Sequence, residues 1–222
     1  MKSELTGEQS TGRALNSMAI TSPLLILISA PSGGGKTTLC QRLLTARPNT
    51  SRAITCTTRL PRQGERDGVD YYFLTAESFL KRVHAGNFLE HATVYGNSYG
   101  TLKSEVLGRM RQGQDVLLTV DVQGAATIRQ KAQEDSELRD ALISVFLTPP
   151  SVSVLQERLE KRGTDSPETI KRRLAVARQE ITQWKHFDYL LLSESIEEDL
   201  RRMLSIVEGE KMRSRRVQAP EF

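Results

Sequence analysis

The feature that most constrains the fold is a glycine-rich loop between a short apolar run and a helix-forming stretch. The apolar run is Leu24 to Ile28, and its lack of alternation indicates a strand buried on both faces. The segment that follows reads Ser29-Ala30-Pro31-Ser32-Gly33-Gly34-Gly35-Lys36-Thr37-Thr38. A strand, a glycine-rich turn and a helix in this order are typical of a P-loop, whose backbone amides bind phosphate oxygens. The alternative is a glycine-rich turn that only caps a helix, and the Lys-Thr pair disfavours it.

Each residue type in such a loop has a chemical task. The residues predicted to bind the nucleotide are Ala30, Pro31, Ser32, Gly33, Gly34, Gly35, Lys36, Thr37 and Thr38. Lys36 is predicted to contact the β- and γ-phosphates of ATP, and the Thr37 hydroxyl is predicted to ligate Mg²⁺. The loop departs from the usual pattern at Ala30, where a glycine is typical. We interpret this as a variation, because alanine is small and is tolerated wherever φ is negative.

The remaining chain alternates apolar runs with amphipathic stretches. Further buried strands are predicted at Val116–Val120, Ile143–Leu147 and Tyr189–Leu192, and helices at Lys36–Leu44, Ser151–Lys161 and Pro167–Lys185. The last of these helices has one apolar face, formed by Ile170, Leu174, Ala177, Ile181 and Trp184. This alternation predicts an α/β fold, a three-layer α/β/α P-loop core with a parallel sheet.

The middle of the chain breaks the rhythm with polar turns and short strand-like runs. Strands are predicted at Tyr71–Leu74, Phe88–Val94 and Tyr95–Tyr99, with a helix at Ala76–Ala85. We expect a small α+β lobe, inserted in the core at about residues 57–102. The domain as a whole is expected to cover residues 23–208.

The two ends and the composition limit the partners. Residues 1–22 lack a sustained apolar period and are predicted to be a mobile tail, and the basic run in residues 209–222 is predicted to be solvated. The formal net charge is +4 and no apolar run reaches the ~18 residues of a membrane span, so neither nucleic acid nor a membrane is expected as a partner. The two cysteines, Cys40 and Cys56, favour a reducing, cytoplasmic compartment, and we expect a monomer or small homo-oligomer.

Beyond the loop, the sequence resembles the guanylate kinase family over about residues 24–208. Six segments carry the resemblance, in the family's order: Thr57–Glu65, Gly68–Phe73, Phe88–Glu90, Tyr99–Thr101, Val120–Gly124 and Arg162–Thr164. The resemblance implies Mg²⁺-dependent transfer of the ATP γ-phosphate to GMP, giving ADP and GDP. It also implies that the inserted lobe binds GMP and that a short helical lid closes over the phosphates.

The resemblance assigns the GMP site to eight positions. Arg59, Arg62, Tyr71 and Tyr99 match the family's phosphate ligands, and guanidinium forks with phenol donors suit a dianion. The family's base-reading acid falls on Glu90 and its hydroxyl partner on Thr101, and Thr55 matches a further family serine that contacts the base. A carboxylate accepts from both guanine N1–H and the 2-amino group, which adenine does not offer. Asp121 matches an aspartate near the metal and the guanine.

The predicted lid covers about residues 158–173 and supplies the arginines of the transition state. Those arginines match Arg158, Arg162 and Arg173, which together with Lys36 are the predicted catalytic residues. The chain departs from the family at Thr119, where an acidic residue is usual, and at Ser193-Glu194, where Asn-Asp is common near the adenine. Charge near Mg²⁺ is therefore reduced, and contact with adenine is altered.

Two other functions stay open at this point. Some guanylate-kinase-like domains are non-catalytic binding modules, but these typically lack the intact Gly35-Lys36-Thr37 sequence that this chain keeps. A related kinase for a sugar phosphate such as ribose bisphosphate would not need Glu90 and Thr101 as a guanine reader.

Overall fold

A parallel sheet forms the centre of the computed structural model, which describes residues 21–94, 96–161, 163 and 165–218. Its strand order is β2-β7-β1-β8-β9, and every neighbouring pair is parallel. The strands are β1 (Leu25–Ser29), β2 (Thr50–Arg52), β7 (Asp115–Thr119), β8 (Leu142–Thr148) and β9 (Tyr189–Leu192). The four predicted strands are confirmed, and β1, which leads into the glycine-rich loop, lies at the middle of the sheet. The prediction that all four are buried is wrong for β9, an edge strand in which Leu190 and Leu192 are 41% and 44% exposed.

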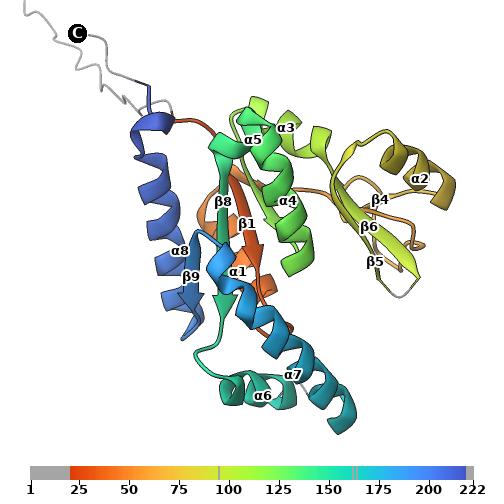
Figure 1. Ribbon diagram of the computed structural model, residues 1–222, viewed down its shortest axis with the longest axis vertical. Helices are drawn as coiled ribbons and strands as arrows, with labels where there is room; N and C mark the ends of the chain where they lie inside the picture. Colours follow the sequence, from red (N-terminus) through yellow and green to blue (C-terminus); the bar gives the residue numbers. More distant parts are fainter. Residues whose placement is uncertain (1–20, 95, 162, 164, 219–222) are drawn as a thin grey trace, which may run out of the picture.

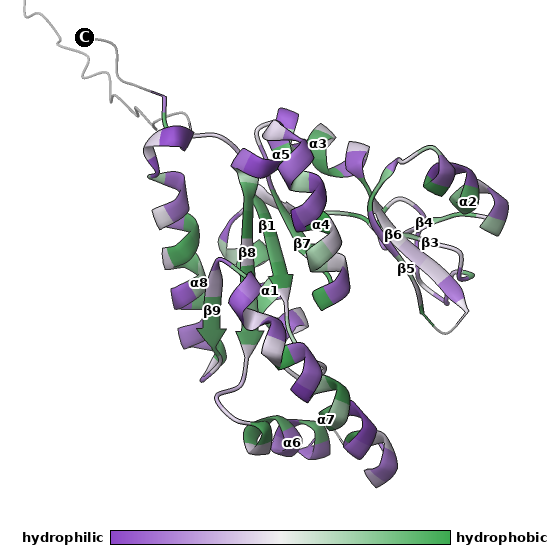
Figure 2. Ribbon diagram, in the orientation of Figure 1, coloured by the Kyte–Doolittle hydropathy of each residue, from purple (hydrophilic) through white to green (hydrophobic). Residues whose placement is uncertain are grey.

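Helices cover both faces of this sheet, which gives the predicted three layers (Figure 1). On one face lie α1 (Lys36–Ala46) and α8 (Ile196–Lys211). On the other lie α3 (Lys103–Arg111), α4 (Val122–Glu134) and α5 (Ser136–Ala141). Figure 2 shows the core strands as continuously apolar and the helices as two-sided, as expected for a sheet buried on both faces.

A second, four-stranded sheet forms a lobe beside the core (Figure 1). Its order is β4-β3-β6-β5, from β3 (Cys56–Thr57), β4 (Tyr72–Phe73), β5 (Phe88–Val94) and β6 (Asn97–Leu102), with α2 (Ala76–His84) packed against it. Phe79 of α2 stacks on Phe88 of β5, with ring centroids 4.4 Å apart. The β5–β6 pair is antiparallel, so it sets side chains of the two strands directly opposite one another.

Two helices extend past the carboxyl ends of the core strands (Figure 1). They are α6 (Val152–Lys161) and α7 (Pro167–Ile181), and Pro167 occupies the predicted first-turn position. The predicted helix to Lys185 is wrong at its end, because residues Thr182–His186 form a 3-10 helix, η1. That tighter turn rotates the face, and Trp184 is left 46% exposed instead of joining the apolar stripe.

The two ends of the described chain pack together, so the prediction of a solvated basic segment is wrong for part of it. Thr21 forms an antiparallel bridge with Val217, beside the short helix η2 (Ser214–Arg216). Arg216 is 2% exposed and pairs with the buried Glu210. Lys211 Nζ lies 2.6 Å from Asp115 Oδ1 at the start of β7.

Both cysteines are buried and unpaired. Burial raises the pKa of the Cys40 thiol, in α1, to about 12 and that of the Cys56 thiol, in β3, to about 11. Within the part of the chain that the structure describes, no helix has the length and apolarity needed to cross a membrane.

Candidate active site

The glycine-rich loop turns tightly between β1 and α1. Gly35 has a φ of 94° and caps α1 without a side-chain hydrogen bond, so the amides of the first turn stay available to a ligand. A methyl group on Gly34 would lie 3.0 Å from both the Ala30 Cβ and the Pro31 carbonyl oxygen. Ala30 is itself buried. The loop therefore accommodates alanine at position 30 but has little space for a side chain at position 34.

Lys36 spans from the loop to the neighbouring strand. Its Nζ donates to the Val120 carbonyl oxygen, 3.1 Å away, just past the end of β7. Burial lowers the pKa of the Lys36 ammonium from its ordinary 10.5, and the neighbouring Cys40, Glu180 and Asp121 partly oppose that shift. The loop, Lys36 and Asp121 thus lie at the carboxyl edge of the sheet, where open α/β sheets bind ligands.

Glu180, at the end of α7, is a charged neighbour of the loop that the sequence patterns did not indicate. Burial raises the pKa of its carboxyl, and attraction to Lys36 and a hydrogen bond from the Ser32 backbone amide lower it in part. Its Oε2 is buried without a hydrogen-bond partner in the described structure. Only proximity in the fold identifies Glu180, because it lies 144 positions from Lys36 in the sequence.

A buried carboxylate faces the core from the lobe. Glu90 on β5 is 8% exposed and lies opposite Thr101 on β6, whose hydroxyl donates to Glu90 Oε1 at 2.8 Å. Burial raises the pKa of Glu90, the Thr101 hydrogen bonds lower it in part, and the Asp121 carboxylate adds to the rise. A methyl group on Gly124 would lie 3.5 Å from Glu90 Oε2 and 3.4 Å from Asp121 Oδ1. The two predicted base-site acids therefore come together at the start of α4, where Asp121 accepts from the Gly124 amide at 2.7 Å.

Three of the predicted phosphate ligands gather on the lobe. The Arg59 guanidinium lies 5.4 Å from the centroid of the Tyr71 ring, and the Tyr71 and Tyr99 rings meet edge-on at 6.2 Å. Arg59 Nη2 lies 2.8 Å and 3.0 Å from the two Glu65 carboxylate oxygens, so part of its hydrogen-bonding capacity is already occupied. The cation and two phenols are nonetheless clustered as a phosphate site requires.

Arg62 and Thr55 border this cluster. The Arg62 side chain is exposed, while its backbone amide donates to Glu65 Oε2 at 2.7 Å. Thr55 is half-buried just before β3, and its carbonyl accepts from the Tyr72 amide at 3.0 Å. Glu65 therefore links the Arg59 side chain to the Arg62 backbone, a connection that the sequence motif alone did not specify.

The predicted lid arginines lie in different surroundings. Arg158 of α6 has its Nη1 3.8 Å from the position of a methyl group on Gly35, next to the phosphate loop. Arg173 of α7 is instead paired with Asp165, at 2.7 Å between Nη1 and Oδ2. The predicted Arg162 lies outside the described residues. Leu155 and Leu159 of α6 pack with Ala177 of α7, which holds the two helices as one apolar-centred pair.

Comparison with known proteins identifies the guanylate kinase family. The family model described as guanylate kinase matches residues 22–210. A guanylate kinase of Ruegeria pomeroyi is 43% identical over 197 residues, covering 89% of each chain. A guanylate kinase of Carboxydothermus hydrogenoformans is 41% identical over 194 residues, covering 87% of this chain and 92% of the relative.

A solved structure agrees with this at the level of the fold. The crystal structure of guanylate kinase from Anaplasma phagocytophilum superposes with a TM-score of 0.68 at 31% identity, covering 90% of this chain and 93% of that one. The matched region includes the phosphate loop, the lobe that carries Glu90 and Arg59, and both helices α6 and α7. With the loop, the buried acid and the family match in agreement, this chain belongs to the guanylate kinase family.

Proposed function

We propose that the protein transfers the γ-phosphoryl group of ATP to GMP, giving ADP and GDP. The phosphate loop with Lys36 is the donor site, and the lobe with Arg59, Arg62, Tyr71 and Tyr99 binds the GMP phosphate. Glu90 reads the guanine with help from Thr101 and Thr55, and Asp121 lies between the base and the phosphates. The arginines at 158, 162 and 173 complete the site when the lid closes.

The buried Glu90–Thr101 pair carries this proposal. Removing a carboxylate from water is costly, so an apolar residue would be expected at the buried position 90 if it served stability alone. Here the Thr101 hydroxyl donates to Oε1, which can accept a second hydrogen bond, and Oε2 lies beside Gly124. Two acceptor oxygens match the two donors of guanine, whereas the N1 of adenine would meet them with a lone pair. A sugar phosphate kinase would not need the Glu90–Thr101 pair. A non-catalytic binding module would not need Lys36.

The residues present fit a magnesium ion delivered with the nucleotide. No cluster of three or more His, Cys, Asp or Glu side chains that could hold a metal occurs among the described residues. Mg²⁺ in kinases is held largely by substrate phosphates and water, so a single hydroxyl from Thr37 suffices on the protein side. When bound, the ion neutralises charge on the phosphate oxygens.

The chain's own part in the reaction is positioning and charge stabilisation. An oxygen of the GMP phosphate attacks the γ-phosphorus as the bond to the β–γ bridging oxygen breaks, so no side-chain nucleophile is needed. The Lys36 ammonium stabilises the negative charge that develops on the bridging oxygen. The lid arginines contact the equatorial oxygens and exclude water, which strengthens each electrostatic contact.

A coupled assay for ADP formation tests the proposal. GMP, dGMP, AMP and ribose bisphosphate are offered separately with Mg–ATP, at matched concentrations. We expect turnover with GMP, weaker turnover with dGMP, and kcat/KM for AMP lower by ~10⁴ or more, since a site with unpaired buried polar groups discriminates strongly. Turnover with ribose bisphosphate but not GMP, or no turnover with any acceptor, would overturn it.

A further inference from the structure

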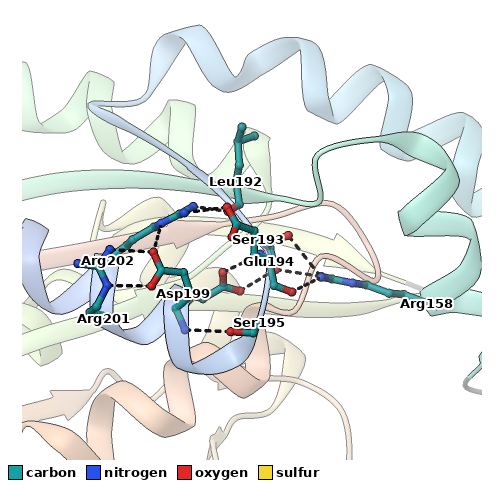
Figure 3. A network of polar contacts seen from close by, with 9 residues as sticks. Arg158, Leu192, Ser193, Glu194, Ser195, Asp199, Arg201 and Arg202 are labelled. Atoms are coloured by element: carbon teal, nitrogen blue, oxygen red, sulfur yellow. Dashed lines mark hydrogen bonds and ion pairs between the residues drawn. The ribbon is translucent and has the colours of Figure 1, made fainter.

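Two buried polar side chains, Ser193 and Asp199, lie in the segment after β9 and in the first turn of α8. Ser193 is 3% exposed and Asp199, in the first turn of α8, is 4% exposed. The Ser193 hydroxyl donates to Asp199 Oδ2 at 2.6 Å, and the Glu194 backbone amide donates to Oδ1 at 3.0 Å (Figure 3). Both oxygens of the Asp199 carboxylate are therefore used by this segment.

Arg158 reaches this segment from α6 (Figure 3). Its Nη1 donates to the Ser193 hydroxyl oxygen at 3.0 Å. Its Nη2 lies at the longer distances of 3.5 Å from the Ser193 carbonyl oxygen and 3.4 Å from that of Glu194. The same Nη1 is close to Gly35, so the guanidinium is held between the β9 segment and the phosphate loop.

The donor and the acceptor of each hydrogen bond between Arg158, Ser193 and Asp199 follow from the chemistry of the three side chains. A serine hydroxyl has one proton, and the Asp199 carboxylate can only accept, so the proton points to Asp199. The lone pairs of Ser193 must then face Arg158, which can only donate. Asp199 thus makes Ser193 an acceptor for Arg158, although it does not touch the arginine.

We propose that Ser193 and Asp199 are positioning residues that hold Arg158 over the phosphate loop for phosphoryl transfer. This rests on the proposed function, in which Arg158 stabilises the transferring group. An arginine already fixed in place loses less side-chain entropy in the transition state and needs no reorganisation. The Ser193–Asp199 pair therefore acts on the ATP side of the reaction and is not expected to affect GMP binding in the lobe.

A purely structural role predicts a different result. Asp199 also anchors the Glu194 amide, and Arg202 binds the outer side of the same segment, with Nη2 2.7 Å from Glu194 Oε1. If the network only stabilises the start of α8, its loss lowers the melting temperature and leaves kcat of the folded protein unchanged.

The experiment compares Ser193→Ala and Asp199→Asn with the control Ser195→Ala. Ser195 caps α8, where its hydroxyl accepts from the Glu198 amide at 3.2 Å. The control therefore removes a hydroxyl from the same segment, but one that makes no hydrogen bond with Arg158. We expect kcat at saturating substrates to fall about tenfold in the two test variants, the scale of one hydrogen bond to a charged group. KM for GMP should stay within about twofold, and the control should keep its kcat.

A double-mutant cycle with Arg158→Ala decides whether the effect runs through the arginine. If it does, adding Ser193→Ala to Arg158→Ala changes kcat by less than about twofold. A further tenfold loss in that background, or Ser193→Ala behaving like Ser195→Ala, would overturn the inference. Ser193→Ala removes one oxygen only, so it gives an answer even if Asp199→Asn unfolds. A wild-type protein without GMP-dependent ADP formation would instead count against the proposed function.

Discussion

At the scale of single residues, the site concentrates charge where the protein interior disfavours it. Lys36 has its pKa lowered by burial, while Glu90 and Glu180 have theirs raised by burial. Each shift means that the charged form is less favourable in the fold than in water. The fold therefore retains these three groups at a cost in stability, which is common at functional sites.

Lys36→Ala should separate the two effects. We expect kcat to fall by at least ~100-fold, because the lysine follows charge that develops only in the transition state. The melting temperature should not fall in parallel, since removal of a desolvated ammonium relieves the cost that lowers its pKa. Steady-state kinetics and thermal unfolding of the same preparation check this. A loss of activity that tracks a loss of stability would show a structural role.

Glu90→Gln should weaken base selectivity and change the pH dependence of stability. The variant replaces one acceptor with a donor, so the GMP/AMP ratio of kcat/KM should fall by at least ~10-fold. The folded-state pKa of Glu90 is raised above 4.5, so the folded state binds its proton more tightly than the unfolded state does. The stability from this group is present below pH 4.5 and is lost as the pH rises through the folded pKa.

The Gln variant does not titrate, so it should gain stability relative to wild type as the pH rises from 4.5 toward neutrality. Urea unfolding at several pH values measures the difference. Thr101→Val, which removes the hydroxyl bonded to Oε1, serves as comparison and should shift selectivity less. An unchanged GMP/AMP ratio in folded Glu90→Gln would remove Glu90 from the base site.

At the scale of elements, the core strands and the phosphate loop were predictable because their signals are local. A strand buried on both faces is apolar throughout, and the loop needs its glycines at fixed offsets. The three-residue β2 lacks such a signal, since all of its residues, Thr50–Arg52, are polar. Trp184 was misassigned because an apolar period continues in the sequence after the backbone has changed to a 3-10 helix.

The candidate site divides in the same way. Residues in motifs, such as Glu90 and Arg59, were predicted, and the structure brings Glu90 to Asp121 and Arg59 to Tyr71. Glu180, Glu65 as the partner of Arg59, and Asp199 behind Ser193 were not predicted as parts of the site. Their roles depend on distances between side chains, which neither spacing nor composition specifies.

Gly34→Ala tests the loop as one packed unit. The new methyl group would meet the Ala30 Cβ and the Pro31 carbonyl oxygen at 3.0 Å, so the backbone must shift and KM for ATP should rise about tenfold. Adding Ala30→Gly should recover part of the loss and not all of it, because the Pro31 oxygen remains. Gly108→Ala, in α3 with nothing within 4 Å of the added methyl, is the matched control and should be neutral or stabilising. No recovery in the double variant would exclude contact with Ala30 as the cause.

At the scale of the whole molecule, the segment after α8 completes the core. Arg216 donates through Nε to the Asp140 carbonyl oxygen at 3.0 Å and pairs with Glu210, whose carboxylate also accepts from the Tyr189 hydroxyl. These contacts join α5, β9 and α8 on the far side of the molecule from the phosphate loop. Burial lowers the pKa of Arg216, but a guanidinium stays protonated, so the fold supplies partners for this buried charge.

Arg216→Met should therefore lower the free energy of unfolding by about 1–3 kcal/mol, because Glu210 Oε2 loses its buried partner while Oε1 keeps Arg213 and the Tyr189 hydroxyl. Arg216→Met with Glu210→Gln should cost less, since no buried carboxylate oxygen then lacks its charged partner. Arg215→Met, at the exposed neighbouring position, is the control and should change stability by less than about 0.5 kcal/mol. Equilibrium urea unfolding measures all three. Equal stability of the two single variants would show that the buried pair is not needed.

The two buried thiols give each half of the molecule its own chemical reporter. With a pKa of about 12, fewer than about one Cys40 in ten thousand is a thiolate at neutral pH, so alkylation by iodoacetamide waits for transient opening around α1. Cys56 reports in the same way on the lobe. An ATP analogue should slow labelling of Cys40 and GMP that of Cys56, as read by mass spectrometry of the peptides. Slower labelling of both cysteines with either ligand would instead mean that the core and the lobe open together. Labelling of the urea-unfolded protein gives the rate for fully accessible thiols.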